Sequence, residues 1–301
     1  MPIIQATRPN AYTGSPLDRA AFRRDDLAWI EAAKTAADTI WVPQAGNRSL
    51  LLGVGSDATT AVLPTTAEAT RLGFLFPEWA FLGLLGDTPV FAGAVDGEPT
   101  PETGTFIDLR AAAGLLPPDQ AGILAHARGL LHWRARHRFC ANCGHLAEPR
   151  AAGNTTVCPQ CGTHHFPRTD PAVIMLVVNG DAALLGHSAR FPTPTMFSTL
   201  AGFVEPGESL EQAVAREVAE EVGVRVHNVT YHSSQPWPFP ASLMVGFHCE
   251  TDDTAITIDP DEIDEARWFT RAELRDPSPH GFDLPRADSI ARRLIEDWLH
   301  A

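Results

Sequence analysis

The chain has 301 residues, 44% hydrophobic and 20% charged, which is enough for a buried core and about two domains. This composition excludes a wholly disordered chain, and the absence of a three-residue glycine period excludes a collagen-like one. The formal net charge of −14 argues against nucleic-acid binding through a broad basic face, because an acidic surface repels phosphate backbones. An anionic substrate would need metal ions or a local positive pocket.

Membrane and export signals are not evident in the sequence. No apolar run approaches the roughly 20 residues that cross a bilayer. The N-terminal stretch MPIIQATRPNAYTG has no charged start followed by an apolar run and a small-residue cleavage site. We therefore expect a cytoplasmic protein without a membrane partner.

The N-terminal third contains short apolar runs separated by Gly, Asp, Pro or Asn, which predict a β-rich domain over residues 1–131. It shows no catalytic constellation. Residues 120–136 are predicted to form a helix, because their apolar residues recur at helical spacing. The predicted strands cover residues 39–42, 49–54, 80–85, 90–95 and 105–109.

Four of the five cysteines form two CxxC pairs, Cys140/Cys143 and Cys158/Cys161, separated by 14 residues. Four thiolates suit the tetrahedral coordination of Zn²⁺, so the spacing predicts a structural zinc ribbon over residues 132–167. A site closed by four cysteines binds one zinc ion and is not catalytic. The fifth cysteine, Cys249, is predicted to be a small buried residue of a strand.

From Asp170 onward, predicted strands alternate with helices, which is typical of a layered α/β domain, here over residues 168–301. Asn179–Gly180 is a strong hairpin signal, and Gly223 is a suitable residue to end a helix. The predicted strands cover residues 172–178, 182–186, 230–233 and 243–250, and the predicted helices cover 208–222 and 289–300.

The helix over 208–222 carries Glu217, Glu220 and Glu221 at positions i, i+3 and i+4, so the three carboxylates share one face. Their mutual repulsion favours a bound hard cation such as Mg²⁺ or Mn²⁺. Three glutamates alone would equally fit a solvated acidic face.

The full string from Gly202 to Val224 resembles the Nudix box, which favours the metal-binding alternative. The resemblance implies an α+β multidomain hydrolase whose C-terminal domain is an α/β/α sandwich with a mixed sheet. It also implies hydrolysis of a nucleoside diphosphate linked to another moiety, with Mg²⁺ or Mn²⁺. The matching positions are Gly202, Glu208, Arg216, Glu217, Val218, Glu220, Glu221, Gly223 and Val224.

The segment from Ser234 to Ser242 reads SQPWPFPAS. Its three prolines stiffen a predicted loop that displays Trp237 and Phe239, either for stacking on flat rings or as packing. The string resembles a signature of Nudix NAD(H) pyrophosphatases, as do the preceding zinc ribbon and residues 166–174. This resemblance implies a homodimer that hydrolyses NADH or NAD⁺ to NMN(H) and AMP.

The same resemblance implies roles for individual residues. Glu217 and Glu221 would bind the catalytic metals, with Glu220 beside them as ligand or base, and the Ala201 carbonyl and Glu262 would be further ligands. Which of Glu220, Glu221 and Glu262 is the general base stays open. Phe166, where the family usually has Tyr, would flank the substrate's rings together with Phe203. The remaining substrate-binding positions would be Gln235, Pro236, Trp237, Pro238, Phe239, Pro240, Ala241, Ser242 and Ala291.

Three alternatives to the hydrolysis of free NAD(H) are considered, two of which change the substrate and one the class of protein. The same chemistry could remove an NAD cap from the 5′ end of RNA. Another nucleoside diphosphate, such as ADP-ribose, could be the substrate. A zinc-ribbon binding module with a decayed catalytic domain is disfavoured by the intact box.

Overall fold

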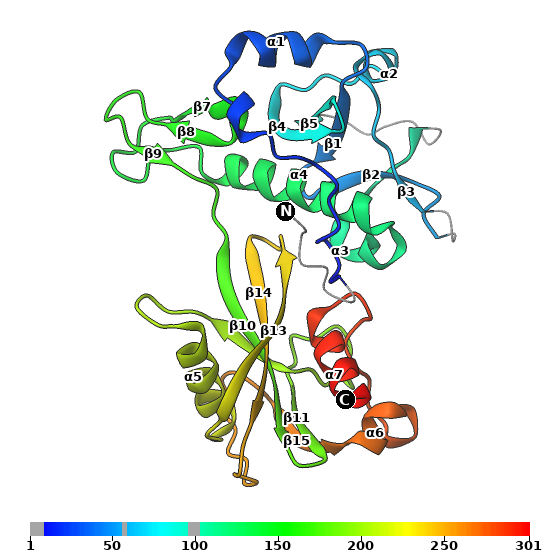
Figure 1. Ribbon diagram of the computed structural model, residues 1–301, viewed down its shortest axis with the longest axis vertical. Coiled ribbons are helices and arrows are strands. Elements are labelled where there is room, and N and C mark those ends of the chain that lie inside the picture. Colours follow the sequence, from blue (N-terminus) through cyan, green and yellow to red (C-terminus); the bar gives the residue numbers. More distant parts are fainter. Residues whose placement is uncertain (1–8, 56–58, 96–102) are drawn as a thin grey trace. The chain divides into compact units, whose positions relative to one another are not determined.

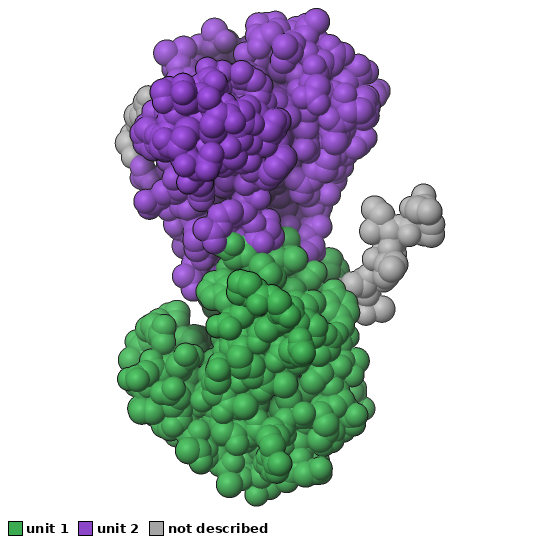
Figure 2. Space-filling view, turned by 90° about the vertical axis from the view of Figure 1, so that its left-hand side faces the viewer, with its two compact units in different colours: residues 1–11, 170–236, 242–301 green, residues 12–169, 237–241 purple. Residues whose placement is uncertain are grey.

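The computed structural model describes residues 9–55, 59–95 and 103–301, which fold into two compact units coloured separately in Figure 2. The C-terminal unit comprises residues 9–11, 170–236 and 242–301. The N-terminal unit comprises the described residues of 12–169 together with 237–241. The cysteine-rich segment belongs to the N-terminal unit. The domain limits predicted at residues 131 and 167 remain a prediction.

The C-terminal unit is built on a mixed sheet with strand order β13-β14-β10-β11-β15, and β12 pairs with β10. The central pair β10 and β14 is parallel, while β11, β12 and β15 are joined antiparallel. Figure 1 shows α5 and α7 on opposite faces of this sheet. The elements are β10 Asp170–Asn179, β11 Ala182–His187, β12 Leu200–Phe203, α5 Leu210–Val222, β13 His227–Trp237, β14 Ser242–Glu250, β15 Glu265–Thr270, α6 Arg271–Arg275, the 3₁₀ helix Ser278–His280 and α7 Ile290–His300.

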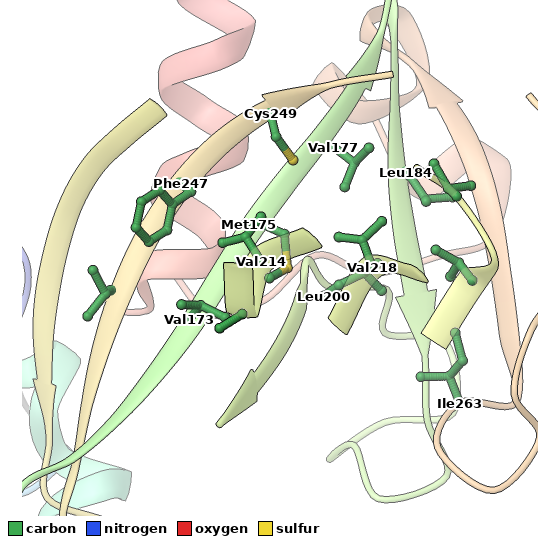
Figure 3. Packing of buried hydrophobic residues seen from close by; sticks show 14 residues of the cluster. Val173, Met175, Val177, Leu184, Leu200, Val214, Val218, Phe247, Cys249 and Ile263 are labelled. Carbon is green, nitrogen blue, oxygen red and sulfur yellow. The ribbon is translucent and has the colours of Figure 1, made fainter. Parts of the chain in front are cut away.

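Alternate residues of β10 point to opposite faces of the sheet, and both faces are buried. Val173, Met175 and Val177 pack in one cluster with Val214 and Val218 of α5 (Figure 3). The intervening residues of β10 pack in a second cluster with α7. A strand covered on both faces has no polar side, which explains the continuous apolar run over 172–178. The predicted α/β/α sandwich is confirmed.

Helix α5 begins two residues later than predicted. Ser209 is its N-cap, and Ser209 and Gln212 form a reciprocal capping box, so the first helical residue is Leu210 rather than Glu208. The helix ends at Val222 because Gly223 adopts a left-handed conformation with φ of 69°. The prediction for Gly223 is therefore confirmed, whereas Glu208 lies in the loop before the helix.

The N-terminal unit also contains a mixed sheet, with order β3-β2-β1-β5-β4 and β6 paired to β2. Its central pair, β1 and β5, is parallel. Helix α4 packs against β1, β4 and β5 and buries the apolar face predicted from its spacing. The elements are the 3₁₀ helix Ala21–Arg23, α1 Leu27–Thr35, β1 Ile40–Ala45, β2 Arg48–Leu52, β3 Thr60–Ala61, α2 Thr66–Arg71, β4 Glu78–Leu85, β5 Thr88–Ala94, β6 Thr105–Asp108, α3 Leu109–Ala112, the 3₁₀ helix Ala113–Leu115 and α4 Pro118–Arg136.

The cysteine-rich segment follows α4 and forms a small three-stranded sheet of order β7-β8-β9. Its strands are β7 Glu148–Arg150, β8 Thr155–Val157 and β9 His164–His165, with a 3₁₀ helix at Ala151–Gly153. Across the described residues, no helix is long and apolar enough to cross a membrane.

Candidate active site

Three carboxylates meet at the C-terminal end of α5. Oxygen atoms of Glu217, Glu221 and Glu262 lie within 4.8 Å of one another. Glu217 and Glu221 are four residues apart on the helix, so they share one face. Glu262 arrives from the loop after β14, where the amide of Asp259 donates to the Glu221 carbonyl at 3.0 Å and the amide of Glu262 donates to the Asp259 carbonyl at 3.1 Å. Backbone hydrogen bonds thus bring the third carboxylate to the helix.

The cluster is electrostatically unbalanced and fits a divalent cation. Burial raises the pKa of Glu221 to about 8, with further repulsion from Glu217 and Glu262, and burial also raises the pKa of Glu217. The Oε2 atom of Glu221 is buried and has no hydrogen-bond partner in the described part of the chain. A hard cation with oxygen ligands would neutralise these charges and satisfy this atom.

Without a divalent cation, Glu221 makes stability depend on pH. The pKa of Glu221 is higher in the folded protein than the ordinary value of 4.5. The contribution of Glu221 to the free energy of unfolding is therefore most favourable below pH 4.5. This contribution is lost as pH rises toward 8, at up to about 1.4 kcal/mol per pH unit. We expect the stability of Glu221→Gln minus that of wild type, measured by urea unfolding in EDTA, to increase from pH 4.5 to 8. Because the histidines are common to both proteins, they cancel, and a flat difference would contradict the buried, unpaired carboxylate.

Gly202 allows Glu217 to reach this position. A Cβ atom at residue 202 would lie 1.9 Å from the Glu217 carboxyl carbon. Gly202 lies on β12, and its neighbour Ala201 donates its backbone N–H to the Glu221 carboxylate. The structure therefore places Ala201, a predicted ligand through its carbonyl, beside the cluster.

We expect Gly202→Ala to reduce divalent-metal-dependent activity by about tenfold or more, because Glu217 must move aside and a metal ligand is misplaced. The assay compares kcat/KM of this variant with Gly129→Ala. At Gly129 of α4, among the described residues outside the helix's own backbone, an added Cβ meets one atom, at 3.8 Å. Equal activity of the two variants would contradict the role of Gly202.

Arg216 connects the loop before α5 to the carboxylates. Its guanidinium binds Glu208 at 2.6 Å, Glu217 at 2.9 Å and Glu220 at 2.8 Å, and donates to the Phe203 carbonyl at 2.9 Å. The hydrogen bonds from Arg216 lower the pKa of Glu208 to about 2. Glu220 is held by Arg216 and is half-exposed, and it is not among the three carboxylates that cluster.

We expect Arg216→Gln to destabilise the protein by about 1–3 kcal/mol, because Glu217 would remain buried without its counter-charge. Urea unfolding of Arg225→Gln provides the control. Arg225 also pairs with a carboxylate, Asp253, but its side chain is 88% exposed, so its loss costs less than about 1 kcal/mol. Similar losses for both variants would contradict the assigned role of Arg216.

The predicted substrate residues of the C-terminal unit have different environments. Phe203 presents a ring that is 60% exposed, whereas Gln235 and Ala291 are buried. The Gln235 amide accepts from the Ile290 N–H at 2.8 Å and donates to the Asp288 carbonyl at 2.8 Å. Gln235 thereby fixes the start of α7, the helix that carries Ala291. Pro236 and Ser242 are half-buried at the facing ends of β13 and β14.

A loop was predicted over residues 234–242, but the loop in the structure is shorter. Strand β13 continues to Trp237, and residues 238–241 form the turn. In the N-terminal unit, the rings of Trp237 and Phe239 pack edge-on against Tyr12 and each other. Arg128 donates to the Pro238 carbonyl and lies 4.7 Å from the Phe239 ring centre. Pro240 is exposed and Ala241 half-buried. These aromatic rings serve packing, and their predicted stacking on substrate remains a proposal.

Phe166 also belongs to the N-terminal unit and follows the cysteine-rich segment. Its ring is 63% exposed and lies 6.3 Å from the ring of His164. The ring is exposed, and its predicted stacking on substrate remains a proposal.

The four predicted zinc ligands converge. Sulfur atoms of Cys140, Cys143, Cys158 and Cys161 all lie within 4.8 Å of one another, with Cys140–Cys161 at 3.6 Å and Cys143–Cys158 at 3.5 Å. A tetrahedral site with Zn–S bonds of about 2.3 Å requires sulfur separations of ~3.8 Å, so the geometry fits zinc. Each pair forms the same turn, in which the amides of Gly144 and Gly162 donate to the first cysteine's carbonyl at 2.9 Å.

Beside these sites, Arg190 was not predicted from the sequence, whereas the burial of Cys249 was. Arg190 donates to the Glu262 carbonyl at 3.2 Å and contributes a positive charge near Glu221. Cys249 is buried, as predicted, and burial raises the pKa of its thiol to about 12, so it is not a candidate nucleophile. The sequence around Arg190 carries no spacing that would have identified it.

Comparison with protein families gives three adjacent matches. Residues 168–294 match the NUDIX domain, residues 38–133 match an NADH pyrophosphatase-like rudimentary NUDIX domain, and residues 135–166 match an NADH pyrophosphatase zinc ribbon domain. A protein of Stutzerimonas stutzeri named NAD-capped RNA hydrolase NudC is 45% identical over 218 residues, covering 72% of this chain and 76% of its own length. The chain belongs to the Nudix hydrolase family. The resemblance predicted from the box is thus confirmed.

Two further relatives of this Nudix hydrolase carry related names. NAD-capped RNA hydrolase NudC of Deinococcus radiodurans is 42% identical over 221 residues, covering 72% of this chain and 76% of that protein. NAD-capped RNA hydrolase NUDT12 of Homo sapiens is 43% identical over 198 residues, which cover 61% of this chain and 43% of that protein. The N-terminal match also explains why the N-terminal sheet has a central parallel pair like that of the C-terminal unit.

Proposed function

We propose that this Nudix hydrolase cleaves the pyrophosphate of NADH or NAD⁺, releasing NMN(H) and AMP, with Mg²⁺ or Mn²⁺ bound to Glu217, Glu221 and Glu262. The observation that carries the proposal is the convergence of these carboxylates on the helix of the Nudix box. An isolated cluster of acidic groups would be costly, and a divalent cation bound there removes that cost.

The residues around the cluster have distinct tasks. A bound divalent cation would neutralise negative charge on the pyrophosphate and would lower the pKa of the attacking water molecule. Arg216 orients Glu217 and Glu220, and the amide of Ala201 orients Glu221. A carboxylate of the site accepts the water's proton, while the water oxygen joins one phosphorus and the bridging oxygen leaves with the other phosphate.

Recognition of the nucleotide would use exposed aromatic rings. Phe203 is largely exposed and follows directly after Gly202, next to the carboxylates. Phe166 is equally exposed in the other unit, and residues 235–242 and Ala291 complete the proposed substrate-binding set. The protein would act as a homodimer, and cysteines arranged for zinc rather than for disulfides favour the cytoplasm.

A second candidate substrate is the NAD cap at the 5′ end of RNA. The relatives named as NAD-capped RNA hydrolases favour it. The pyrophosphate chemistry would be the same, but RNA adds a phosphate backbone that an acidic protein must bind locally. Comparing kcat/KM for NADH and NAD-capped RNA at two salt concentrations separates the two substrates, because RNA-body contacts give a steep salt dependence.

The direct test is a metal-dependent assay on NADH with chromatographic identification of the products. NMNH and AMP in equal amounts would support the proposal. If ADP-ribose or another nucleoside diphosphate in the same substrate panel is hydrolysed preferentially, that compound replaces NAD(H) as the proposed substrate. Failure to hydrolyse any of these with Mg²⁺ or Mn²⁺ would overturn the proposed function.

A further inference from the structure

Arg190 approaches the carboxylate cluster from the loop that follows β11. Strands β11 and β15 pair antiparallel, and the last residue of β11 lies opposite the first residue of β15. The residues just after β11 therefore lie beside those just before β15. The amide of Ala189 donates to the Asp264 carboxylate. The guanidinium of Arg190 donates to the Glu262 carbonyl at 3.2 Å. The fold thus anchors a positive charge on the residue that supplies the third carboxylate of the cluster.

The guanidinium of Arg190 keeps unused N–H donors at this position. Among the described residues, the Glu262 carbonyl is the one hydrogen-bond acceptor of its side chain, and it forms no ion pair with a carboxylate. Arg216 also lies beside the cluster, but its guanidinium is bonded to three carboxylates and a backbone carbonyl. Because a guanidinium carries five N–H donors and Arg190 is exposed, Arg190 can bind a ligand, whereas Arg216 is engaged within the protein.

The charges at the edge of the cluster favour an anion that binds together with a cation. Burial and the repulsion of neighbouring carboxylates raise the pKa of Glu221, and the positive charge of Arg190 opposes this rise. With the carboxylates neutralised by a divalent cation, the guanidinium of Arg190 is left as an uncompensated positive charge beside the site. A phosphate group bound there would meet positive charge from two sides in a protein of net charge −14.

We propose that Arg190 binds the pyrophosphate of the substrate, beside the cation-binding carboxylates. This inference rests on the proposed function, in which a pyrophosphate is the group that is cleaved. The guanidinium donates two parallel, charge-assisted hydrogen bonds to phosphate oxygens. Arg190 transfers no proton. Its positive charge stabilises the negative charge that develops on the phosphate oxygens as the water oxygen joins one phosphorus and the bridging oxygen leaves with the other.

The test measures kcat/KM for NADH at saturating Mn²⁺ in Arg190→Gln and in the wild-type chain. Calorimetry measures the affinity for Mn²⁺ alone, and for AMP and NMN in the presence of Mn²⁺. We expect kcat/KM to fall about tenfold or more, because a charge-assisted phosphate contact is lost. The affinity for whichever product carries the contacted phosphate should also fall. The affinity for Mn²⁺ should not weaken, since the charge of Arg190 repels a cation. Arg190→Lys keeps the charge without the planar fork and should give an intermediate kcat/KM.

The matched control is Arg275→Gln. Arg275 is exposed in the same unit and, like Arg190, donates to a backbone carbonyl, that of Leu299, at 3.0 Å. This bond joins α6 to α7, and α7 covers the face of the sheet opposite α5 (Figure 1). Loss of an arginine with the same kind of contact, away from the carboxylates, should leave kcat/KM and both product affinities within about twofold of wild type.

Three results would overturn the role of Arg190. One is an unchanged kcat/KM in Arg190→Gln, and another is equal binding of both products by Arg190→Gln and Arg275→Gln. The third is a loss of Mn²⁺ affinity in proportion to the loss of activity, because Arg190 would then act by positioning Glu262. A wild-type chain that hydrolyses no nucleoside diphosphate would overturn the proposed function instead, and the binding of AMP and NMN would still test Arg190. If another nucleoside diphosphate is preferred, the same comparison of kcat/KM uses that compound.

Discussion

Replacing Glu221 with Gln is expected to reduce divalent-metal-dependent hydrolysis of NADH by on the order of 10²–10³-fold, equivalent to about 3–4 kcal/mol of transition-state stabilisation. Glu221 is 5% exposed and belongs to the cluster with Glu217 and Glu262. The amide is nearly the same size as the carboxylate but carries no charge, so it binds a hard cation poorly. Steady-state kinetics across a Mg²⁺ and Mn²⁺ titration measures the effect.

The matched control for this substitution is Glu211→Gln on the same helix. Glu211 lies exposed in the first turn of α5, away from the three clustered carboxylates. It should retain activity within about twofold of wild type. Calorimetric titration with Mn²⁺ gives a second readout, in which Glu221→Gln should lose affinity and Glu211→Gln should not. Full activity of Glu221→Gln would remove Glu221 from the metal site.

The second large effect is expected from Cys158→Ser, which should abolish binding of zinc and unfold the cysteine-rich segment. Structural zinc contributes on the order of 10 kcal/mol in small zinc domains, because the sulfur ligands are brought together only by the metal. Cys158 is 1% exposed. The three remaining thiols therefore cannot rearrange to complete the zinc site without disrupting the turn that contains residue 158. Zinc content by mass spectrometry of the metal and proteolysis between residues 138 and 166 measure the two consequences.

Cys249→Ser is the control for loss of a buried cysteine. Cys249 lies on β14 and contacts the Leu176 carbonyl, with its sulfur 3.8 Å from that oxygen. Its replacement should cost about 1–2 kcal/mol of stability yet leave one zinc per chain. If Cys158→Ser retained zinc at the wild-type ratio, the four-cysteine site would be wrong.

The elements predicted most accurately are those whose pattern is local. The spacing of apolar residues in α4, the hairpin at Asn179–Gly180 and the two CxxC turns each depend on neighbours a few residues away. The Nudix box is also continuous along the chain, so the faces of Glu217 and Glu221 followed from helical geometry. The start of α5 was missed by two residues because Ser209 is the N-cap, which leaves Glu208 in the loop before the helix.

Features that depend on contacts between segments far apart in the sequence could not be predicted from residue patterns. Glu262 reaches the cluster through backbone hydrogen bonds of its loop to α5, and only family resemblance indicated it. The hydrogen bonds of the Gln235 amide to the backbone of residues 288 and 290 join segments more than 50 residues apart. Arg190 approaches Glu262 from a loop more than 70 residues earlier in the sequence. Sequence spacing carries no information about such tertiary pairings.

The central claim is that Glu217, Glu221 and Glu262 together hold the catalytic cation. A crystal structure determined after soaking with Mn²⁺, with anomalous diffraction to locate the ion, tests it most directly. We predict an anomalous peak about 2.0–2.3 Å from carboxylate oxygens of these three residues. Crystals that hydrolyse NADH while Mn²⁺ binds at other residues would contradict the account.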